Sequence, residues 1–445
     1  MNQPRRRSTE LGLLVVALLV VTGAYVLTSL GRSSALPANI VPFLVAVLGL
    51  FLIAHLVNRR FAPHADASLL PIAALLNGLG YVLIARMSKG DSTVKNLATQ
   101  QATWTAVGML GYIGTLVFFR RVKSLERVRY TVGLVGVVLL ILPMVPGVGV
   151  SINGARIWTR IGPIGFQPGE LAKLALAIFF AGYLVQRREL LGLATFRIGP
   201  FVTPDPKYLA PVLAAWGFSL VVMIFEKDLG SALLFFVLFL SVLWVATERA
   251  SYLVVGGVLF GAGSVATWAS FAHVHQRVAM WLDPWTDPQG KGYQIIQAQY
   301  ALAWGGVGGT GLGLGITGRI PYQETDFIFA IIGEELGLVG AAAILIAYLL
   351  IAGAGYRIAV RATDPFSKLL ATGLTTLIAV QSFIIMGGVT RLLPLTGVTL
   401  SFVSYGGSSL ISNWILIALL VRISDDTNSV ATDARDDATT VLSLR

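Results

Sequence analysis

The chain has 445 residues, of which 55% are hydrophobic and 12% are charged, and its mean hydropathy of +0.76 excludes an ordinary soluble protein. It has no cysteine, which excludes disulfides and thiolate metal sites. A net charge of +11 would suggest nucleic-acid binding in a soluble protein. Here the basic residues lie mainly in short loops between apolar runs, so the expected partner is a membrane and no nucleic acid.

Apolar runs of about 20 residues recur along the chain, and each is long enough to cross a hydrocarbon core of about 30 Å. The runs are continuous and do not alternate with polar residues, which favours helices over barrel strands. We therefore predict an all-α, polytopic integral membrane protein with about twelve transmembrane helices. The predicted spans are residues 11–30, 38–57, 69–86, 101–119, 130–147, 169–186, 208–225, 229–247, 251–271, 328–353, 367–388 and 398–422.

The distribution of basic residues predicts the orientation of the chain. Arginines at 5–7 precede the first span, and basic clusters return in every second loop. Both termini are therefore expected in the cytoplasm, including the acidic segment 425–445, whose composition predicts disorder. The same parity places the loop 148–168 and the large loop 272–327, between the ninth and tenth helices, on the extracytoplasmic side.

The segment FQPGELAKLAL, from Phe166 to Leu176, is predicted to open a helix at Pro168. Glu170 and Lys173 then lie three residues apart on one helical face and can pair. Two roles fit this spacing. The pair can neutralise itself as a salt bridge at a helix start, or Lys173 can lie beside an anionic lipid headgroup.

The segment EKDLGSALLFF, from Glu226 to Phe236, places Asp228 at another predicted helix start. A carboxylate in this position can accept hydrogen bonds from free backbone N–H groups, so capping accounts for Asp228 without a functional role. Glu226 and Lys227 are not needed for the cap, and a functional role stays open for them.

The loop 272–327 and the helix that follows it hold six of the 22 acidic residues of the chain: Asp283, Asp287, Glu324, Asp326, Glu334 and Glu335. The segment WLDPWTDPQGKGYQ has two Asp-Pro pairs with glycines and aromatic residues, which is typical of a rigid loop at a membrane interface. Two carboxylates above a pocket with Lys173 have the parts for general-base chemistry on an anionic lipid substrate.

Three further features of this region have structural explanations. The glycine run 305–315 lacks the Lys-Ser/Thr end of a phosphate loop, so its glycines are expected to allow close backbone packing. Asp326 can cap the helix that starts near Phe327. Glu334 and Glu335 lie about two turns inside that helix, where they cannot cap it, and we expect them to have partners or water.

These motifs resemble, in order, those of the SEDS family (shape, elongation, division and sporulation), the RodA/FtsW-type peptidoglycan glycosyltransferases. The matching segments are NGARIW, FQPGELAK, EKDLGSAL, DPQGKGYQIIQ, TDFIFAIIGEELG and LLPLTGVTLSFVSYGGSSL. The resemblance implies a ten-helix core over residues 69–424 that contains the catalytic loop 272–327. Residues 1–68 would then form two additional N-terminal helices.

The resemblance also implies an activity. Lipid II would be polymerised into glycan strands outside the membrane with release of undecaprenyl diphosphate, in cell-wall elongation and cell-shape control. A class B penicillin-binding protein would be the cognate transpeptidase. By position, the essential loop aspartate of the family matches Asp287, its Glu and Lys match Glu170 and Lys173, and its acidic DLG position matches Asp228. The remaining candidates for substrate binding are Arg156, Gln294, Asp326 and Glu335.

The chain departs from the family pattern at several positions. Ile157 stands where the family often has an arginine before the tryptophan, so the match of Arg156 is displaced by one residue. Glu226 and Lys227 replace a frequent Gln-Pro pair, and Glu324 replaces a frequent histidine. Longer RodA-like proteins of actinobacteria are similar in these departures, which favours the elongation branch.

The resulting hypothesis makes Asp287 the base that takes a proton from the acceptor sugar's 4-hydroxyl. Lys173, Arg156 and a divalent cation such as Mg²⁺ or Mn²⁺ are candidates for stabilising the diphosphate leaving group, and no organic cofactor is expected. A lipid II flippase or another multi-pass transporter is the alternative, because many helices with buried charges also suit a transporter. A third possibility is a scaffold that only positions a transpeptidase.

Overall fold

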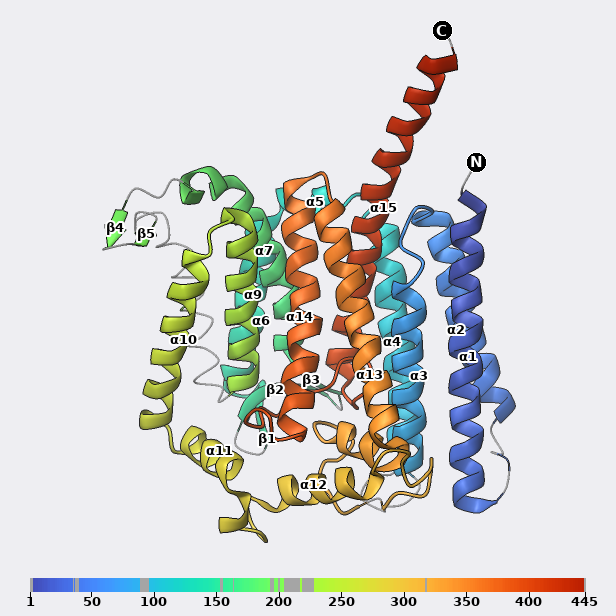
Figure 1. The fold of residues 1–445 in the computed structure, drawn as a ribbon, viewed down its shortest axis with the longest axis vertical. Coiled ribbons are helices and arrows are strands. Elements are labelled where there is room, and N and C mark those ends of the chain that lie inside the picture. Colours follow the sequence, from blue (N-terminus) through green and yellow to red (C-terminus); the bar gives the residue numbers. More distant parts are fainter. Residues whose placement is uncertain are drawn as a thin grey trace.

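A computed structural model describes residues 3–34, 36, 40–88, 96–152, 155–162, 164–192, 196–198, 201–203, 217, 228–316 and 318–443. It is a bundle of long helices (Figure 1). The helices are α1 (Gln3–Ser33), α2 (Ile40–Phe61), α3 (Leu69–Met87), α4 (Leu97–Phe118), α5 (Lys123–Arg127), α6 (Arg129–Ile141), η2 (Leu142–Met144), α7 (Pro168–Gly192), α9 (Leu229–Thr247), α10 (Ser251–Ser270), α11 (Ala272–Leu282), η3 (Pro284–Thr286), α12 (Tyr293–Gly305), α13 (Ile328–Arg361), α14 (Pro365–Val389) and α15 (Gly407–Ser443). The strands are β1 (Gly149–Ile152), β2 (Ala155–Ile161), β3 (Ile164–Phe166), β4 (Phe196–Ile198) and β5 (Phe201–Thr203).

The predicted all-α membrane fold is confirmed. In the described ranges, nine helices are long and apolar enough to cross a membrane, namely α1, α2, α3, α7, α9, α10, α13, α14 and α15. α4 and the shorter α6 stand beside them in the bundle (Figure 1). Of the predicted span 208–225, the structure describes only Gly217.

The two ends of the bundle differ. α1 begins and α15 ends at the same end, whereas α11, α12 and the sheet of β1 to β3 gather at the opposite end, which we call the loop end (Figure 1). This arrangement has the parity expected from the basic loops. It also brings segments from the middle and the last third of the chain together at the loop end.

α14 lies in the centre of the bundle and α10 at its edge. Of the most apolar stretch of α14, 83% is buried, compared with 6% for α10. At the start of α14, Asp364 caps the helix by accepting a hydrogen bond from Ser367 N (3.1 Å), and Pro365 occupies the first helical position. The exposed apolar side chains of α10, such as Val258 and Val265, suit a lipid environment.

α13 is interrupted at Gly337, where φ is 64° and ψ is −165°. The glycine-rich loop, residues 305–316, lies in this interruption. Gly311 N donates to Glu335 O (3.0 Å), and Leu338 N donates to Gly306 O (2.9 Å). The break frees backbone groups inside an apolar bundle, and the loop supplies their partners. At Gly305 a Cβ atom would collide with the backbone of Gly333, so only glycine fits there.

The last predicted span started too early. α15 begins at Gly407, and the buried apolar residues that precede it have irregular backbone. Two side chains form hydrogen bonds with backbone groups of this segment: Leu400 N donates to Ser404 Oγ (2.9 Å), and Gln381 Nε2 donates to Thr399 O (2.7 Å). Irregular backbone is tolerated inside a membrane bundle when protein groups pair with it.

Two other expectations also need correction. The segment 425–445 was expected to be disordered, but α15 continues to Ser443, with Asp425 accepting from His64 N (2.7 Å) and Asp426 from Val122 N (3.0 Å). These partners come from other parts of the chain, so composition alone could not show them. Within the loop 148–168, β1, β2 and β3 form an antiparallel sheet that hydropathy did not predict.

Gly305→Ala should destabilise the protein by about 1 to 3 kcal/mol, because the added methyl group has no space against the backbone of α13. Gly308→Ala is the matched control, since a Cβ atom at Gly308 meets nothing within 4 Å. Its stability should stay within about 0.5 kcal/mol of the parent. Thermal unfolding in detergent measures both, and equal stability of the two variants would contradict the packing described for this loop.

Candidate functional site

The candidate residues that the structure brings together lie at the loop end, around the start of α7. Lys173 Nζ donates to Glu170 Oε1 (2.9 Å) and to Gln381 Oε1 (3.0 Å). Glu170 is only 2% exposed and Lys173 only 3%. The predicted Glu170–Lys173 pair is therefore present, and it is enclosed by protein. Buried charges of this kind need a partner, and here each has one.

Serines at the start of α15 hold the start of α7 in place. Gln167 N donates to Ser408 Oγ (2.9 Å), and Ser412 Oγ donates to Glu170 O (2.7 Å). These contacts give Ser408 and Ser412 a role in packing α15 against α7. They fix the first turn of α7, from which Glu170 and Lys173 project.

Asp287 lies in a tight turn between η3 and α12. Its Oδ2 accepts from Lys291 N (3.0 Å), and its side chain is partly exposed. Gly290 leaves space for this carboxylate, because a Cβ atom there would collide with it. Asp283, by contrast, is exposed and caps η3 by accepting from Trp285 N (3.0 Å). The two Asp-Pro pairs thus have different structural positions.

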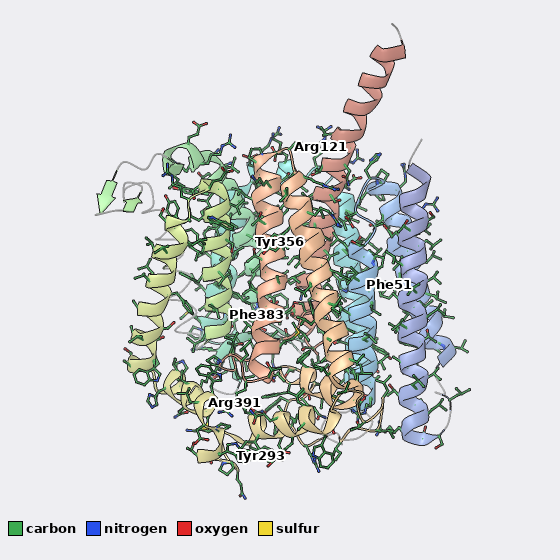
Figure 2. The ribbon with its side chains drawn as sticks, viewed as in Figure 1. Phe51, Arg121, Tyr293, Tyr356, Phe383 and Arg391 are labelled. Atoms are coloured by element: carbon green, nitrogen blue, oxygen red, sulfur yellow. The ribbon has the colours of Figure 1, made fainter. Side chains whose placement is uncertain are left out.

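α11 connects the Asp287 turn to the rest of the loop end, where Figure 2 labels Arg391 and Tyr293. Trp281 Nε1 donates to Arg391 O (3.1 Å), and Arg391 Nε donates back to Trp281 O (2.8 Å). Arg277 Nη1 donates to Thr396 O (3.0 Å). The segment that α11 contacts leads to Thr399, whose carbonyl binds Gln381, the partner of Lys173. Residues 391–399 are therefore hydrogen-bonded to α11, which precedes the Asp287 turn, and to Gln381, which binds Lys173.

Asp228 caps α9, accepting from Ser231 N (3.0 Å), as expected for a carboxylate at a helix start. Gly230 in the first turn of α9 approaches Thr396 and Val398, since a Cβ atom there would contact both side chains. Asp228 therefore lies near the same 391–399 segment. Glu226 and Lys227 lie outside the described residues.

Asp326 does not cap α13. Its Oδ1 accepts from the Thr325 hydroxyl (3.0 Å), and Phe327, at the N-cap position, makes no side-chain cap. Burial raises the pKa of Asp326, while the Thr325 hydrogen bond and the charge of Arg277 oppose the increase. Nearby, Gln294 Nε2 donates to Pro321 O (3.0 Å) and attaches the start of α12 to the same loop.

Glu335 has a different environment from Lys173. It forms a buried ion pair with Arg86 of α3, and its Oε2 accepts from Gly313 N (3.0 Å). Glu334 Oε1 accepts from Ile316 N (2.9 Å). Both carboxylates therefore have the partners that their depth predicted, and they hold the glycine-rich loop. Sequence reasoning missed Arg86, although a lone arginine inside a predicted apolar span is a signal for such a pair.

Arg156 is exposed on β2 at the loop end. Arg160 is also exposed on the same strand, and the even spacing puts both arginines on one face of the sheet. Arg160 was not predicted as a candidate, and neither were Gln381 and Arg277. The alternation of polar and apolar residues in ARIWTRI, which is typical of a strand, is the only sequence signal for Arg160. It was overlooked because residues 148–168 were predicted to form a loop.

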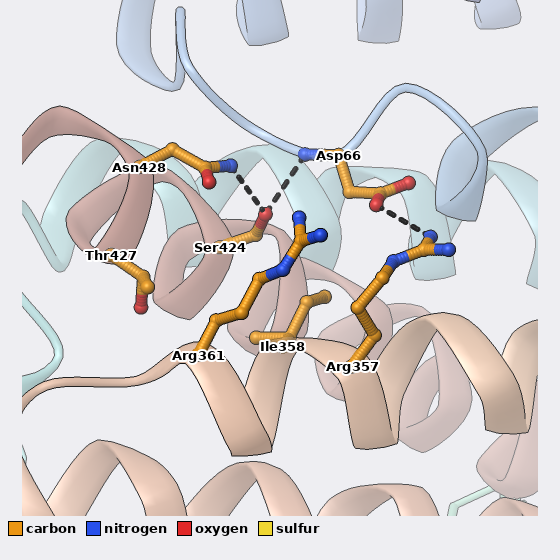
Figure 3. A pocket seen from close by; sticks show the side chains of 7 residues that line it. All are labelled: Asp66, Arg357, Ile358, Arg361, Ser424, Thr427 and Asn428. Carbon is orange, nitrogen blue, oxygen red and sulfur yellow. Dashed lines mark hydrogen bonds and ion pairs between the residues drawn. The ribbon is translucent and has the colours of Figure 1, made fainter. Parts of the chain in front are cut away.

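A pocket at the opposite end of the bundle does not belong to this site (Figure 3). It is lined by Asp66, Arg357, Ile358, Arg361, Ser424, Thr427 and Asn428. Asp66 pairs there with Arg357 (2.9 Å). This pocket lies where α13 ends and α15 continues beyond the bundle, far from α11 and α12 (Figure 1).

Comparison with known proteins gives consistent matches. Residues 67–429 match the sequence model of the FtsW, RodA and SpoVE family, described as "Cell cycle protein". The chain is 45% identical over 426 residues to the peptidoglycan glycosyltransferase RodA of Mycobacterium tuberculosis, covering 95% of this chain and 91% of that one. It is 35% identical over 363 residues to the probable peptidoglycan glycosyltransferase FtsW of the same organism, covering 80% and 66%.

The fold also matches a solved structure. A chain described under "Structural coordination of polymerization and crosslinking by a peptidoglycan synthase complex" superposes with a TM-score of 0.67 at 27% identity. The match covers 82% of this chain and 98% of that one. The family match starts at residue 67, so α1 and α2 lie outside it.

Glu335→Ala should lower stability by about 3 to 5 kcal/mol, because it leaves the buried Arg86 guanidinium without its partner. The double variant Arg86→Met/Glu335→Leu should recover most of this loss, since neither charge then stays buried alone. Thermal unfolding of the three proteins measures the effect. A double variant that is less stable than Glu335→Ala would show that the ion pair is not the main contribution.

Asp326→Asn should stabilise the protein relative to the parent more at pH 7 than at pH 4. The pKa of Asp326 is raised by burial, so its contribution to stability is present below its unfolded-state pKa of about 4. That contribution is lost as the pH rises through the folded-state pKa. Unfolding temperatures of both proteins across this pH range test the sign, and a constant difference would refute it.

Proposed function

The chain belongs to the family of FtsW, RodA and SpoVE cell cycle proteins and is a peptidoglycan glycosyltransferase, and we propose that it polymerises lipid II with Asp287 as the general base. Family membership supports the reaction. The position of Asp287 supports its role, because the carboxylate is partly exposed in a turn that α11 ties to the segment next to the Lys173 network.

In the proposed step, Asp287 accepts the proton of the acceptor sugar's 4-hydroxyl as that oxygen attacks the anomeric carbon of the donor. A bond forms between this oxygen and the anomeric carbon, and the bond from that carbon to the diphosphate oxygen breaks. Undecaprenyl diphosphate leaves with the bonding electrons. Among the described residues, only one oxygen of Asp287 has a protein donor, so the other can face a sugar hydroxyl.

The charge that develops on the diphosphate needs cations. We propose that exposed Arg156 and Arg160 contact the diphosphate directly. Lys173 is buried and paired with Glu170, so it does not contact the diphosphate in this proposal. Its proposed contribution is to position the start of α7 and to add positive potential beneath the substrate. We propose that the substrate site is also shaped by three residues through the contacts described above, namely Asp228, Gln294 and Asp326.

A divalent cation at the diphosphate would need ligands from the substrate. In the part of the chain that the structure describes, no group of three or more His, Cys, Asp or Glu side chains could hold a metal ion. Mg²⁺ can bind with one or two carboxylates when substrate phosphates complete its ligands. The donor groups do not fit a site made by protein alone, so we assign no step to a metal.

We propose that the loop end faces the extracytoplasmic side and that both termini face the cytoplasm, because the basic loops lie at the end of the bundle opposite α11 and α12. We further propose a class B penicillin-binding protein as the partner, since the matched solved chain comes from a complex that coordinates polymerization and crosslinking. A role in elongation is supported by 45% identity to RodA against 35% to FtsW.

Transport of lipid II is the alternative function. It predicts movement of labelled lipid II across proteoliposome membranes without formation of glycan polymer. The clustering of polar groups at one end of the bundle favours polymerisation, because transporter sites usually lie near the midplane.

Asp287→Asn should lower the polymerisation rate of purified protein on labelled lipid II by about 100-fold or more, because it removes the base and keeps the oxygen that accepts from Lys291 N. Asp283→Asn is the matched control. It keeps the cap of η3 and should stay within about threefold of the parent. A normal rate for folded Asp287→Asn, or an equal loss in both variants, would reject Asp287 as the base.

A further inference from the structure

The first helix, which lies outside the family match, contacts the loop end directly. Gly31, in the last turn of α1, packs against the glycine-rich loop so closely that a Cβ atom there would lie 2.5 Å from Leu312 O. In the reverse direction, a Cβ atom at Gly313 would lie 2.5 Å from Thr28 O. Backbone therefore lies on backbone at this contact, which leaves no space for a Cβ atom at Gly31 or at Gly313.

A polar path continues from this contact into the bundle. Arg32 Nη1 donates to Arg86 O (2.7 Å). The Arg86 guanidinium pairs with Glu335, and Glu335 Oε2 accepts from Gly313 N (3.0 Å). The path thus leaves α1 at Arg32, passes through α3 and α13, and returns to the loop that α1 contacts.

Apolar packing fixes the rest of α1 in this position. Val21 and Ala24 of α1 are buried in a second hydrophobic cluster with Phe43 of α2 and Val82 of α3, against which Leu312 of the glycine-rich loop also packs. The rings of Phe43 and Tyr81 stack with centroids 5.1 Å apart. This cluster is separate from the main core and exists only because α1 and α2 are present.

The glycine-rich loop in turn controls the position of α12. α12 ends at Gly305, which packs on the backbone of α13, and it starts close to Gln294, which binds Pro321 O (3.0 Å). The Asp287 turn immediately precedes α12. A displacement of the loop would therefore be passed along α12 toward Asp287.

We propose that α1 is a positioning element for the extracytoplasmic loop, with Gly31 and Arg32 as positioning residues that fix the glycine-rich loop and, through α12, Asp287. This inference rests on the proposed function of Asp287 for its effect on catalysis. The contact between α1 and the loop does not depend on that function. Misplacement of a base by about 1 Å can reduce a rate by as much as 100-fold, so the effect of this contact on activity should be measurable.

The test compares Gly31→Ala with Gly23→Ala in the full-length protein. Both add one methyl group to α1, but a Cβ atom at Gly23 meets nothing within 4 Å. Gly31→Ala should increase hydrogen exchange of the amides in residues 305–316 by about tenfold and lower kcat for lipid II by about tenfold, with KM within about twofold. Gly23→Ala should change neither. Equal exchange and equal kcat in the two variants would overturn the proposal.

Arg32 provides a second arm that does not add bulk. Arg32→Lys keeps a donor for Arg86 O, whereas Arg32→Ala removes it. The lysine variant should therefore keep the kcat and the slow hydrogen exchange of residues 305–316 seen in the parent. The alanine variant should have a lower kcat and faster exchange. Indistinguishable lysine and alanine variants would overturn the role of Arg32, including where Gly31→Ala fails to fold. If the parent protein does not polymerise lipid II, the proposed function fails, and loop exchange still decides whether α1 fixes the loop.

Discussion

Backbone and charged groups inside a membrane bundle must find partners within the protein, and the interruption of α13 at Gly337 is where this constraint shapes the molecule most. The carbonyls freed at the break bind the glycine-rich loop, and the two glutamates beside the break bind amides of that loop. Glycines are required because backbone must approach backbone. The polar loop is thus secured to an apolar helix without losing hydrogen bonds.

The same constraint explains the candidate site. Lys173 can be buried because Glu170 and Gln381 bind it, and the irregular segment before α15 can be buried because Gln381 and Ser404 bind its backbone. These bonds make residues 391–399 a shared support, on which α11 and the start of α9 also rest. Asp287 is therefore carried by an exposed loop with a rigid attachment, which is what a general base requires.

Sequence reasoning succeeded where the signal is local. Hydropathy found the described spans because each is a continuous apolar run, and α9 starts at Leu229 because Asp228 caps it. It failed where partners are distant: Gln381 is 208 residues from Lys173, and no local pattern links them. The apolar residues before Gly407 looked helical because hydropathy reports burial and not hydrogen bonding. Arg86 could have been recognised as half of a buried pair, but Glu335 could not have been named as its partner.

The central claim is that the loop end of the bundle binds lipid II with its reacting hydroxyl at Asp287 and its diphosphate near the exposed arginines of β2. A structure of the inactive Asp287→Asn protein in lipid nanodiscs with lipid II tests it most directly. The account predicts the acceptor 4-hydroxyl within hydrogen-bond distance of residue 287 and the diphosphate in contact with Arg156 or Arg160. Lipid II bound at the bundle midplane, with its sugars away from the Asp287 turn, would contradict it.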